Sequence, residues 1–202
     1  MHAVVLNCTL KPFPQPSHTA LLAQVVVEEL ERLCVSVDVV RVVDQLVPPG
    51  VGTDLGDADD WPRLHDQLLR SAILVLASPT QLGRPSSIAQ RVLERMDAMR
   101  GETDETGRPV AYNRVAGVVV TAQEDGAQHV ISEIAGALVG LGYTVPGQGW
   151  TYWNGGPGPG PSYADTDDGH AWSERTGRTM ARNLHAVAQA MAGAPMSAPP
   201  SR

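Results

Sequence analysis

Three apolar, β-branched runs in this chain each end at a short polar loop, and a segment with helical periodicity follows each loop. The three stretches are VVLNCTLKPFPQPSHTALL, ILVLASPTQLGRPSSIAQRVL and GVVVTAQEDGAQHVISEI. In a parallel sheet, the loops that leave the carboxyl ends of neighbouring strands meet at one edge. The pattern therefore predicts a small-molecule crevice that is built from three loops.

The same periodicity predicts five strands that alternate with helices. We expect strands over residues 3–8, 35–43, 71–77 and 115–120, and a fifth within 144–152. We expect helices that begin at Ser17 and at Ser86 or Ser87, and helices over 61–70, 126–141 and 168–191. This alternation predicts an α/β fold with a right-handed, doubly wound, five-stranded parallel sheet and helices on both faces.

Local signals set several boundaries. Ser17 is a natural N-cap after a loop with three prolines, and a break at Gly142 ends the fourth predicted helix. Pro146 and nearby glycines interrupt the fifth strand, which favours an edge position. The 202 residues fit one domain over 1–192, with a disordered tail at 193–202.

Composition narrows the classes of partner. The net charge is -7, so the chain lacks the clustered Lys and Arg that nucleic acid or an anionic membrane surface requires. No apolar run approaches the ~20 residues that span a bilayer, and Met1 leads directly into a strand pattern. These features predict a cytoplasmic location.

Cysteine and histidine usage gives no sign of a disulfide or a metal. Cys8 and Cys34 are the only cysteines, and we expect both to be buried, reduced thiols. The six histidines are scattered without the spacing of metal ligands, so we expect no metal. His129 lies one turn into a predicted helix and is not expected to be catalytic.

The first loop leads into a helix N-terminus, where free N–H groups can bind phosphate. Its candidate ligands are Thr9, Lys11, Ser17, His18 and Thr19. A capped helix after a proline-rich turn explains the same residues, so both interpretations stay open.

No Walker motif and no G-x-G-x-x-G fingerprint is present. The absence of a G-x-S-x-G elbow argues against a serine hydrolase, and the lack of an acidic pair after the first strand argues against a phospho-receiver.

The second stretch continues as SPTQLGRPSSIAQRVLERMDAM, and the third as VVVTAQEDGAQHVISEIAGALVGLGYTVP. The second resembles the S/T-P-x-x-x-G-x-x-S-S-x-x-K/R-x-x-x-D/E-R segment of the flavodoxin-like NAD(P)H-dependent oxidoreductases, the FMN and quinone reductase superfamily. The resemblance extends from Met1 through the last helix and implies a flavodoxin-like, FMN-binding domain.

The resemblance also implies a role for each loop. In the family, the first loop binds the FMN phosphate, the second the ribityl chain and ring edge, and the third the pyrimidine. Carried over, the phosphate ligands are Thr9, Ser17 and Thr19; the residues at the flavin edge are Pro79, Thr80, Gln81, Leu82 and Gly83; those at the pyrimidine are Thr121, Gln123, Glu124, Asp125 and Gly126.

Three aromatic residues gather just after the fifth strand, in a chain with only 4% aromatic residues. Trp150, Tyr152 and Trp153 are candidates for a wall of the substrate pocket over the flavin. Packing of the last helix, or a subunit interface, is the alternative explanation.

The sequence therefore predicts an FMN-dependent oxidoreductase that takes hydride from NAD(P)H and passes electrons to a quinone or similar small acceptor, without a catalytic side chain. Two alternatives remain open. One is a flavodoxin-type FMN electron carrier without NAD(P)H oxidase activity. The other is a flavin-free binding protein with the same fold. Family resemblance also implies a possible homodimer.

Overall fold

The computed structural model describes residues 1–158 and 160–200, and its centre is a parallel sheet. The strands are β1 (His2–Asn7), β2 (Ser36–Arg41), β3 (Ile73–Gln81), β5 (Val115–Ala122) and β6 (Trp150–Asn154), with a short β4 (Arg84–Pro85) beside β3. The order is β2-β1-β3-β5-β6, and all neighbours on this path pair in parallel. The predicted doubly wound sheet is confirmed, with the strand order of flavodoxin-like folds.

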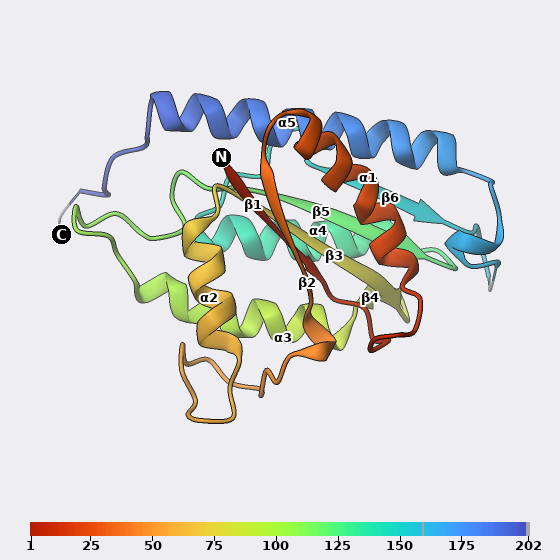
Figure 1. Ribbon diagram of the computed structural model, residues 1–202, viewed down its shortest axis with the longest axis horizontal. Helices are drawn as coiled ribbons and strands as arrows, with labels where there is room; N and C mark the ends of the chain where they lie inside the picture. Colours follow the sequence, from red (N-terminus) through yellow and green to blue (C-terminus); the bar gives the residue numbers. More distant parts are fainter. Residues whose placement is uncertain (159, 201–202) are drawn as a thin grey trace.

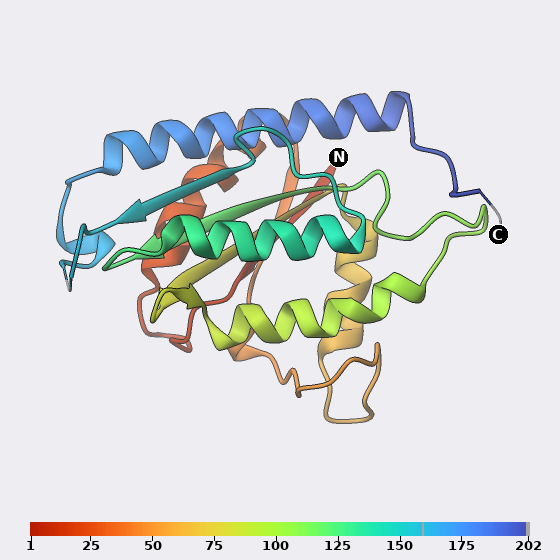
Figure 2. The same cartoon turned by 180° about the vertical axis from the view of Figure 1, so that it is seen from behind.

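Helices cover both faces of the sheet (Figures 1 and 2). They are α1 (His18–Arg32), α2 (Trp61–Arg70), α3 (Ser87–Met96), α4 (Ala127–Leu141) and α5 (His170–Gly193), with short 3-10 turns η1 (Val42–Asp44), η2 (Asp97–Gly101) and η3 (Tyr163–Asp165). One core joins α1 and α5 to the sheet, and the other joins α2, α3 and α4 to the opposite face. Side chains alternate along β1, so Val5 enters the first core and Leu6 the second.

Side chains and backbone conformation fix the predicted helix ends. The Ser17 hydroxyl accepts a hydrogen bond from Ala20 N at 3.1 Å, and Ser86 caps α3 through Ala89 N at 3.1 Å. Gly142 ends α4 with φ of +107°, a left-handed conformation that glycine adopts without strain. These predicted boundaries are confirmed.

Several strand bounds differ from the prediction. The second strand ends at Arg41, because residues 42–44 turn into η1. β3 continues past Ala77 into a hairpin with β4, which the sequence pattern did not predict. The edge position of the fifth strand is confirmed, but β6 begins only at Trp150, since a turn with a bond from Gly149 N to Pro146 O precedes it.

The two cysteines lie in different surroundings, and both are free. Cys8 is buried, as expected, and burial raises the pKa of its thiol well above the ordinary range. The expectation of a buried Cys34 is wrong, because this residue follows the end of α1 and is exposed, with φ of +59°.

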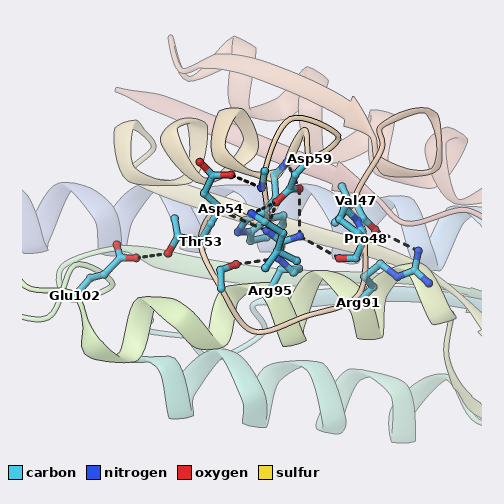
Figure 3. Close-up of polar contacts among 12 residues, drawn as sticks. Val47, Pro48, Thr53, Asp54, Asp59, Arg91, Arg95 and Glu102 are labelled. Carbon is cyan, nitrogen blue, oxygen red and sulfur yellow. Dashed lines mark hydrogen bonds and ion pairs between the residues drawn. The ribbon is translucent and has the colours of Figure 1, made fainter.

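A buried ion pair holds the irregular connection between η1 and α2 (Figure 3). The side chains of Arg95 on α3 and Asp59 have no exposed surface, and their closest N–O distance is 2.5 Å. Arg95 also donates to the carbonyl oxygens of Pro48 and Gly52, both at 3.0 Å. The Arg95 side chain thereby provides hydrogen-bond donors for carbonyl groups of a connection that has no regular secondary structure to pair them.

The C-terminal residues are partly described. Met196 exchanges two hydrogen bonds with Asn113, at 2.7 and 3.3 Å. Residues 201–202 of the predicted disordered tail lie outside the described residues.

Among the residues that the structure describes, no helix is both long enough and apolar enough to cross a bilayer.

Candidate functional site

A cavity of about 300 Å³ opens at the carboxyl edge of the sheet, where the loops after β1, β3 and β5 meet. Its walls are formed by Thr9, Leu10, Lys11, His18, Thr19, Pro79, Thr80, Gln81, Leu82, Thr121, Ala122, Gln123, Glu124, Trp153, Ser162 and Tyr163. The three polar loops identified in the sequence therefore contribute to one concave site, as parallel-strand geometry requires.

The first loop is held in shape from behind. The Arg41 guanidinium donates to the carbonyl oxygens of Gln15 and Lys11, at 2.9 and 3.4 Å, and Phe13 N donates to Asp44 Oδ1 at 3.0 Å. Lys11 N donates to Thr9 Oγ1 at 3.2 Å. These bonds present Lys11, the single lysine of the chain, to the cavity.

Two hydroxyls that the sequence assigns to phosphate already have protein partners. Ser17 does not line the cavity; its hydroxyl caps α1 and lies 3.3 Å from Asn7 Nδ2. Thr19 lines the cavity, but its Oγ1 lies 2.7 Å from Thr121 Oγ1 and links α1 to β5. Thr9, Lys11, His18 and Thr19 line this end of the cavity, and it lies beside the start of α1, where helix amides lack partners within the helix.

His18 is held as a hydrogen-bond acceptor on one side. Its Nδ1 accepts from Ala164 N at 3.2 Å. Burial, followed by the positive charge of Lys11, lowers the His18 pKa, while the carboxylate of Asp165 acts in the opposite direction. A neutral ring that accepts at Nδ1 carries its proton on Nε2, which leaves that N–H free to donate.

The second loop forms a tight hairpin with its tip at the cavity. Gln81 pairs with Arg84, so Leu82 and Gly83 are the two turn residues. Leu82 lines the cavity, but Gly83 at the tip does not. The Thr80 hydroxyl oxygen is buried and has no hydrogen-bond partner among the described residues. Such a group is costly to bury, which favours a ligand or water that bonds to it.

The third loop contributes Thr121, Gln123 and Glu124 to the cavity, whereas Asp125 and Gly126 lie outside it. Gly126 has a structural role instead. Its φ is +118°, and an added Cβ would lie 2.9 Å from the Cα of Gly83. The third loop therefore packs directly against the tip of the hairpin, and only glycine allows this approach.

The aromatic residues of β6 divide between the two faces of the sheet. Only Trp153 lines the cavity; Trp150 and Tyr152 pack against the core on the α3 and α4 side. Trp150 and Tyr152 therefore lie outside this cavity, and the Tyr152 ring packs against Trp172 of α5 with centroids 4.9 Å apart, which agrees with the alternative explanation of packing against the last helix. Alternation along a strand explains the division, since neighbouring residues face opposite ways.

One wall of the cavity was not predicted from the sequence, and a closing segment at residues 160–165 supplies it. Ser162 and Tyr163 line the cavity, and the Tyr163 ring packs edge-on against Trp153 with centroids 5.6 Å apart. The segment is bonded to both flanking loops, through Gln123 Nε2 to Ser162 Oγ at 2.7 Å and through Ala164 N to His18. In the sequence, the aromatic residues Trp153 and Tyr163 were the available sign of this wall.

The described part of the chain contains no group of three or more His, Cys, Asp or Glu side chains in a metal-binding arrangement. The cavity instead combines one cationic end, at Lys11 and the start of α1, with apolar walls at Leu10, Leu82 and Trp153. This division suits a ligand with an anionic group and a planar ring.

Comparison with known proteins defines the class. Residues 1–157 match the family of NADPH-dependent FMN reductases, and the chain belongs to this family. It is 32% identical over 205 residues to the 8-demethyl-8-aminoriboflavin-5'-phosphate synthase of Streptomyces davaonensis, with 96% of this chain and 80% of that protein covered. The resemblance to flavodoxin-like reductases is thereby confirmed.

A solved structure agrees with this relationship. RosB, crystallised with the bound intermediate 8-demethyl-8-formylriboflavin-5'-phosphate, superimposes with a TM-score of 0.90 at 32% identity, over 97% of this chain and 82% of that one.

The divalent metal cation transporter MntH of Mycobacterium bovis is 36% identical over 208 residues, which cover 100% of this chain. The chain spans only 30% of the length of that relative.

Proposed function

We propose that this chain binds flavin mononucleotide in the cavity at the carboxyl edge of the sheet and acts as an NAD(P)H-dependent oxidoreductase that passes electrons to a quinone or similar small acceptor. The observation that carries the proposal is the meeting of three polar loops at one cavity with a cationic end. Membership of the NADPH-dependent FMN reductase family supports the choice of flavin and of nicotinamide donor.

The residues of the cavity suit the parts of this ligand. Lys11, the His18 Nε2–H and the first amides of α1 are donors for the phosphate. The unpartnered Thr80 hydroxyl offers a hydrogen bond, and Pro79 and Leu82 offer apolar surface to the ring. Glu124 is an acceptor for a ring N–H. When bound, the flavin supplies the redox chemistry, so the protein has to bind and orient rather than exchange protons.

The flavin-binding candidates from the sequence keep unequal support. Gly83, Asp125, Gly126 and Ser17 do not line the cavity. Gly83 and Gly126 act through the shape of the loops, and Ser17 through the start of α1. Gln81, Thr121 and Gln123 remain proposed contacts, together with Thr9 and Thr19.

A second function is favoured by one observation. RosB, whose structure resembles this one at a TM-score of 0.90, holds a flavin phosphate as a reaction intermediate. The same cavity would then take a flavin phosphate as the substrate that is modified, rather than as a resident cofactor.

One assay separates these functions. Purified protein with FMN, NADPH and a naphthoquinone is followed by NADPH absorbance, and the flavin is then examined by mass spectrometry. We expect NADPH oxidation that depends on protein and quinone, with unchanged flavin mass. A changed flavin mass would favour flavin modification. NADPH oxidation that requires a separate reductase would favour the electron carrier, and failure to bind FMN at micromolar concentration would leave a flavin-free binding protein.

The cytoplasmic location and the homodimer also remain proposals. The homodimer is tested by light scattering coupled to gel filtration, where the mass of two chains is expected and that of one chain would reject it.

A further inference from the structure

A second cavity, of about 500 Å³, opens at the amino edge of the sheet and shares no lining residue with the cavity at the carboxyl edge. Ala72 and Arg114, which directly precede β3 and β5, lie in its walls together with the ends of α2 and α5. The end of α5 and the connection that leads into β5 lie at the end of the molecule away from the β4 hairpin (Figures 1 and 2). The cavity is therefore separate from the site proposed for flavin.

Positive charge is concentrated in this amino-edge cavity, although the chain has a net charge of -7. Its charged lining residues are Arg70, Asp104, Arg108 and Arg114. Asp104 Oδ2 lies 3.0 Å from Arg108 Nε and 2.9 Å from Arg108 Nη2. The Thr106 hydroxyl and further hydrogen bonds lower the Asp104 pKa, so this carboxyl is charged and paired. Three arginines and one paired carboxylate leave two positive charges, at Arg70 and Arg114.

Arg114 is half-buried and has no carboxylate partner among the described residues. Its Nε donates to Val110 O at 2.7 Å and its Nη1 to Ser71 O at 2.6 Å. These bonds fix the plane of the guanidinium, but carbonyl oxygens carry no net charge to balance it. Burial lowers the Arg114 pKa, whereas the fully buried Arg95 is paired with Asp59. A partly desolvated cation without a counter-charge is costly, which favours an anion bound beside it.

The other walls suit an organic ligand. Arg70 is exposed at the last residue of α2, and its side chain forms no hydrogen bond or ion pair with the described residues. The Tyr112 ring lies against Gly142, where an added Cβ would be 3.0 Å from Tyr112 Cδ1. Leu69 and Met191 add apolar surface. The cavity thus combines guanidinium donors with an aromatic and apolar wall, which is typical of a small-molecule site.

We propose that the amino-edge cavity binds an organic phosphate monoester. The guanidinium groups of Arg70 and Arg114 hold the phosphate, and Tyr112 with its apolar neighbours contacts the organic part. A phosphate monoester carries a charge of about -1.5 to -2 at pH 7, which matches the two positive charges of the cavity. The planar guanidinium fork also fits phosphate oxygens in pairs.

The test uses adenosine monophosphate as the probe and isothermal titration calorimetry as the measurement. We expect Arg70→Met to weaken its binding about tenfold, because a hydrogen bond to a charged group is lost. Since Arg70 is exposed and has no partner among the described residues, the fold should be unchanged, which circular dichroism checks. Inorganic phosphate and adenosine, which each provide half of the probe, are expected to bind at least about tenfold more weakly than the whole.

Two control variants locate the binding. Arg175→Met removes another exposed helical arginine, on α5 and outside both cavities, and should leave the affinity unchanged. Lys11→Met removes the cationic group of the carboxyl-edge cavity and should also leave it unchanged. A loss of affinity in Lys11→Met but not in Arg70→Met would place the probe in the carboxyl-edge cavity and overturn the proposal.

Further outcomes would also overturn the proposal. They are a failure of adenosine monophosphate to bind at millimolar concentration, or an equal loss in Arg175→Met and Arg70→Met. Inorganic phosphate that binds as tightly as the probe would remove the role of the organic part, and adenosine that does so would remove the role of the arginines. None of these results depends on flavin binding, so this proposal and the proposed function can fail separately.

Discussion

At the scale of single residues, the polar groups at the start of α1 divide into those that build the site and those that face a ligand. Ser17 caps the helix, and Thr19 bonds to Thr121. Lys11 and His18 line the cavity. Their donor groups, Lys11 Nζ and His18 Nε2, form no hydrogen bond with the described residues. Sequence can identify this loop, but it does not reveal which hydroxyls are already engaged.

Replacing Lys11 with Met is therefore expected to weaken FMN about tenfold, since a hydrogen bond to a charged group is lost. Riboflavin affinity should not change. Fluorescence titration of both flavins measures the effect, and equal weakening of both would place Lys11 away from the phosphate.

Ser17→Ala is the matched comparison for the same helix start. The loss of an N-cap is expected to lower the free energy of unfolding by about 1 kcal/mol. Because the Ser17 hydroxyl does not face the cavity, the FMN affinity per folded molecule is expected to stay within about twofold of wild type. Urea unfolding and flavin titration test the two parts, and a tenfold loss of FMN affinity would return Ser17 to the phosphate site.

At the scale of elements, α3 has a second role besides covering the sheet, because its Arg95 anchors the connection before α2 (Figure 3). Burial is the largest single effect on the Asp59 carboxyl and raises its pKa. Hydrogen bonds from Arg95 and from the amides of Trp61 and Leu55 outweigh it, so the Asp59 pKa lies below its ordinary value. The ion pair fixes a connection that has little regular structure of its own.

Arg95→Met is expected to lower the free energy of unfolding by about 3–5 kcal/mol, because it leaves the Asp59 charge buried without its partner. The double variant Arg95→Met, Asp59→Asn should recover part of this loss. Chemical unfolding curves provide the measurement, and a single variant as stable as wild type would contradict the role of the pair.

The same ion pair predicts the direction of a pH effect. A carboxyl with a lowered folded pKa adds stability above its unfolded value, about pH 3.9, and this contribution is lost as the pH falls through the folded pKa. Wild type should therefore lose stability below pH 4 more steeply than Asp59→Asn. Parallel curves for the two proteins would contradict this.

Elements also show what the sequence could predict. The long apolar runs predicted β1, β3 and β5. The bounds of α2 were also predicted, because the helical pattern is clear there and Pro62 stands in its first turn, where proline is tolerated. The hairpin of β4 was missed, since Leu-Gly lacks the usual Asn-Gly signal. The fifth strand was expected within 144–152, but β6 runs from Trp150 to Asn154, because a turn closed by a bond from Gly149 N to Pro146 O occupies the first part of that stretch.

At the scale of the whole molecule, the doubly wound topology follows from alternating strands and helices, and it brings the three loops together without any knowledge of side-chain contacts. The fourth wall of the cavity could not be predicted in this way. It comes from residues 160–165, whose position depends on bonds to His18 and Gln123 far away in the sequence.

Because the proposed ligand contacts several loops and α1, its binding should stabilise the molecule as a unit. FMN at about one hundred times its Kd is expected to add about 2.7 kcal/mol, which corresponds to a rise in melting temperature of about 5–10 °C. Differential scanning fluorimetry measures this shift. The Lys11→Met protein should show a smaller shift at the same FMN concentration, and an equal one would count against the proposed phosphate contact.

The closing segment lies outside the part of the chain that matches the family. The family match ends at residue 157, whereas Ser162 and Tyr163 lie beyond it. The segment is connected to the site through hydrogen bonds to Gln123 and His18, whereas the three polar loops continue directly from strands of the sheet. Exchange of residues 160–165 is therefore expected to reshape this one wall of the cavity while the sheet and its three loops keep their positions.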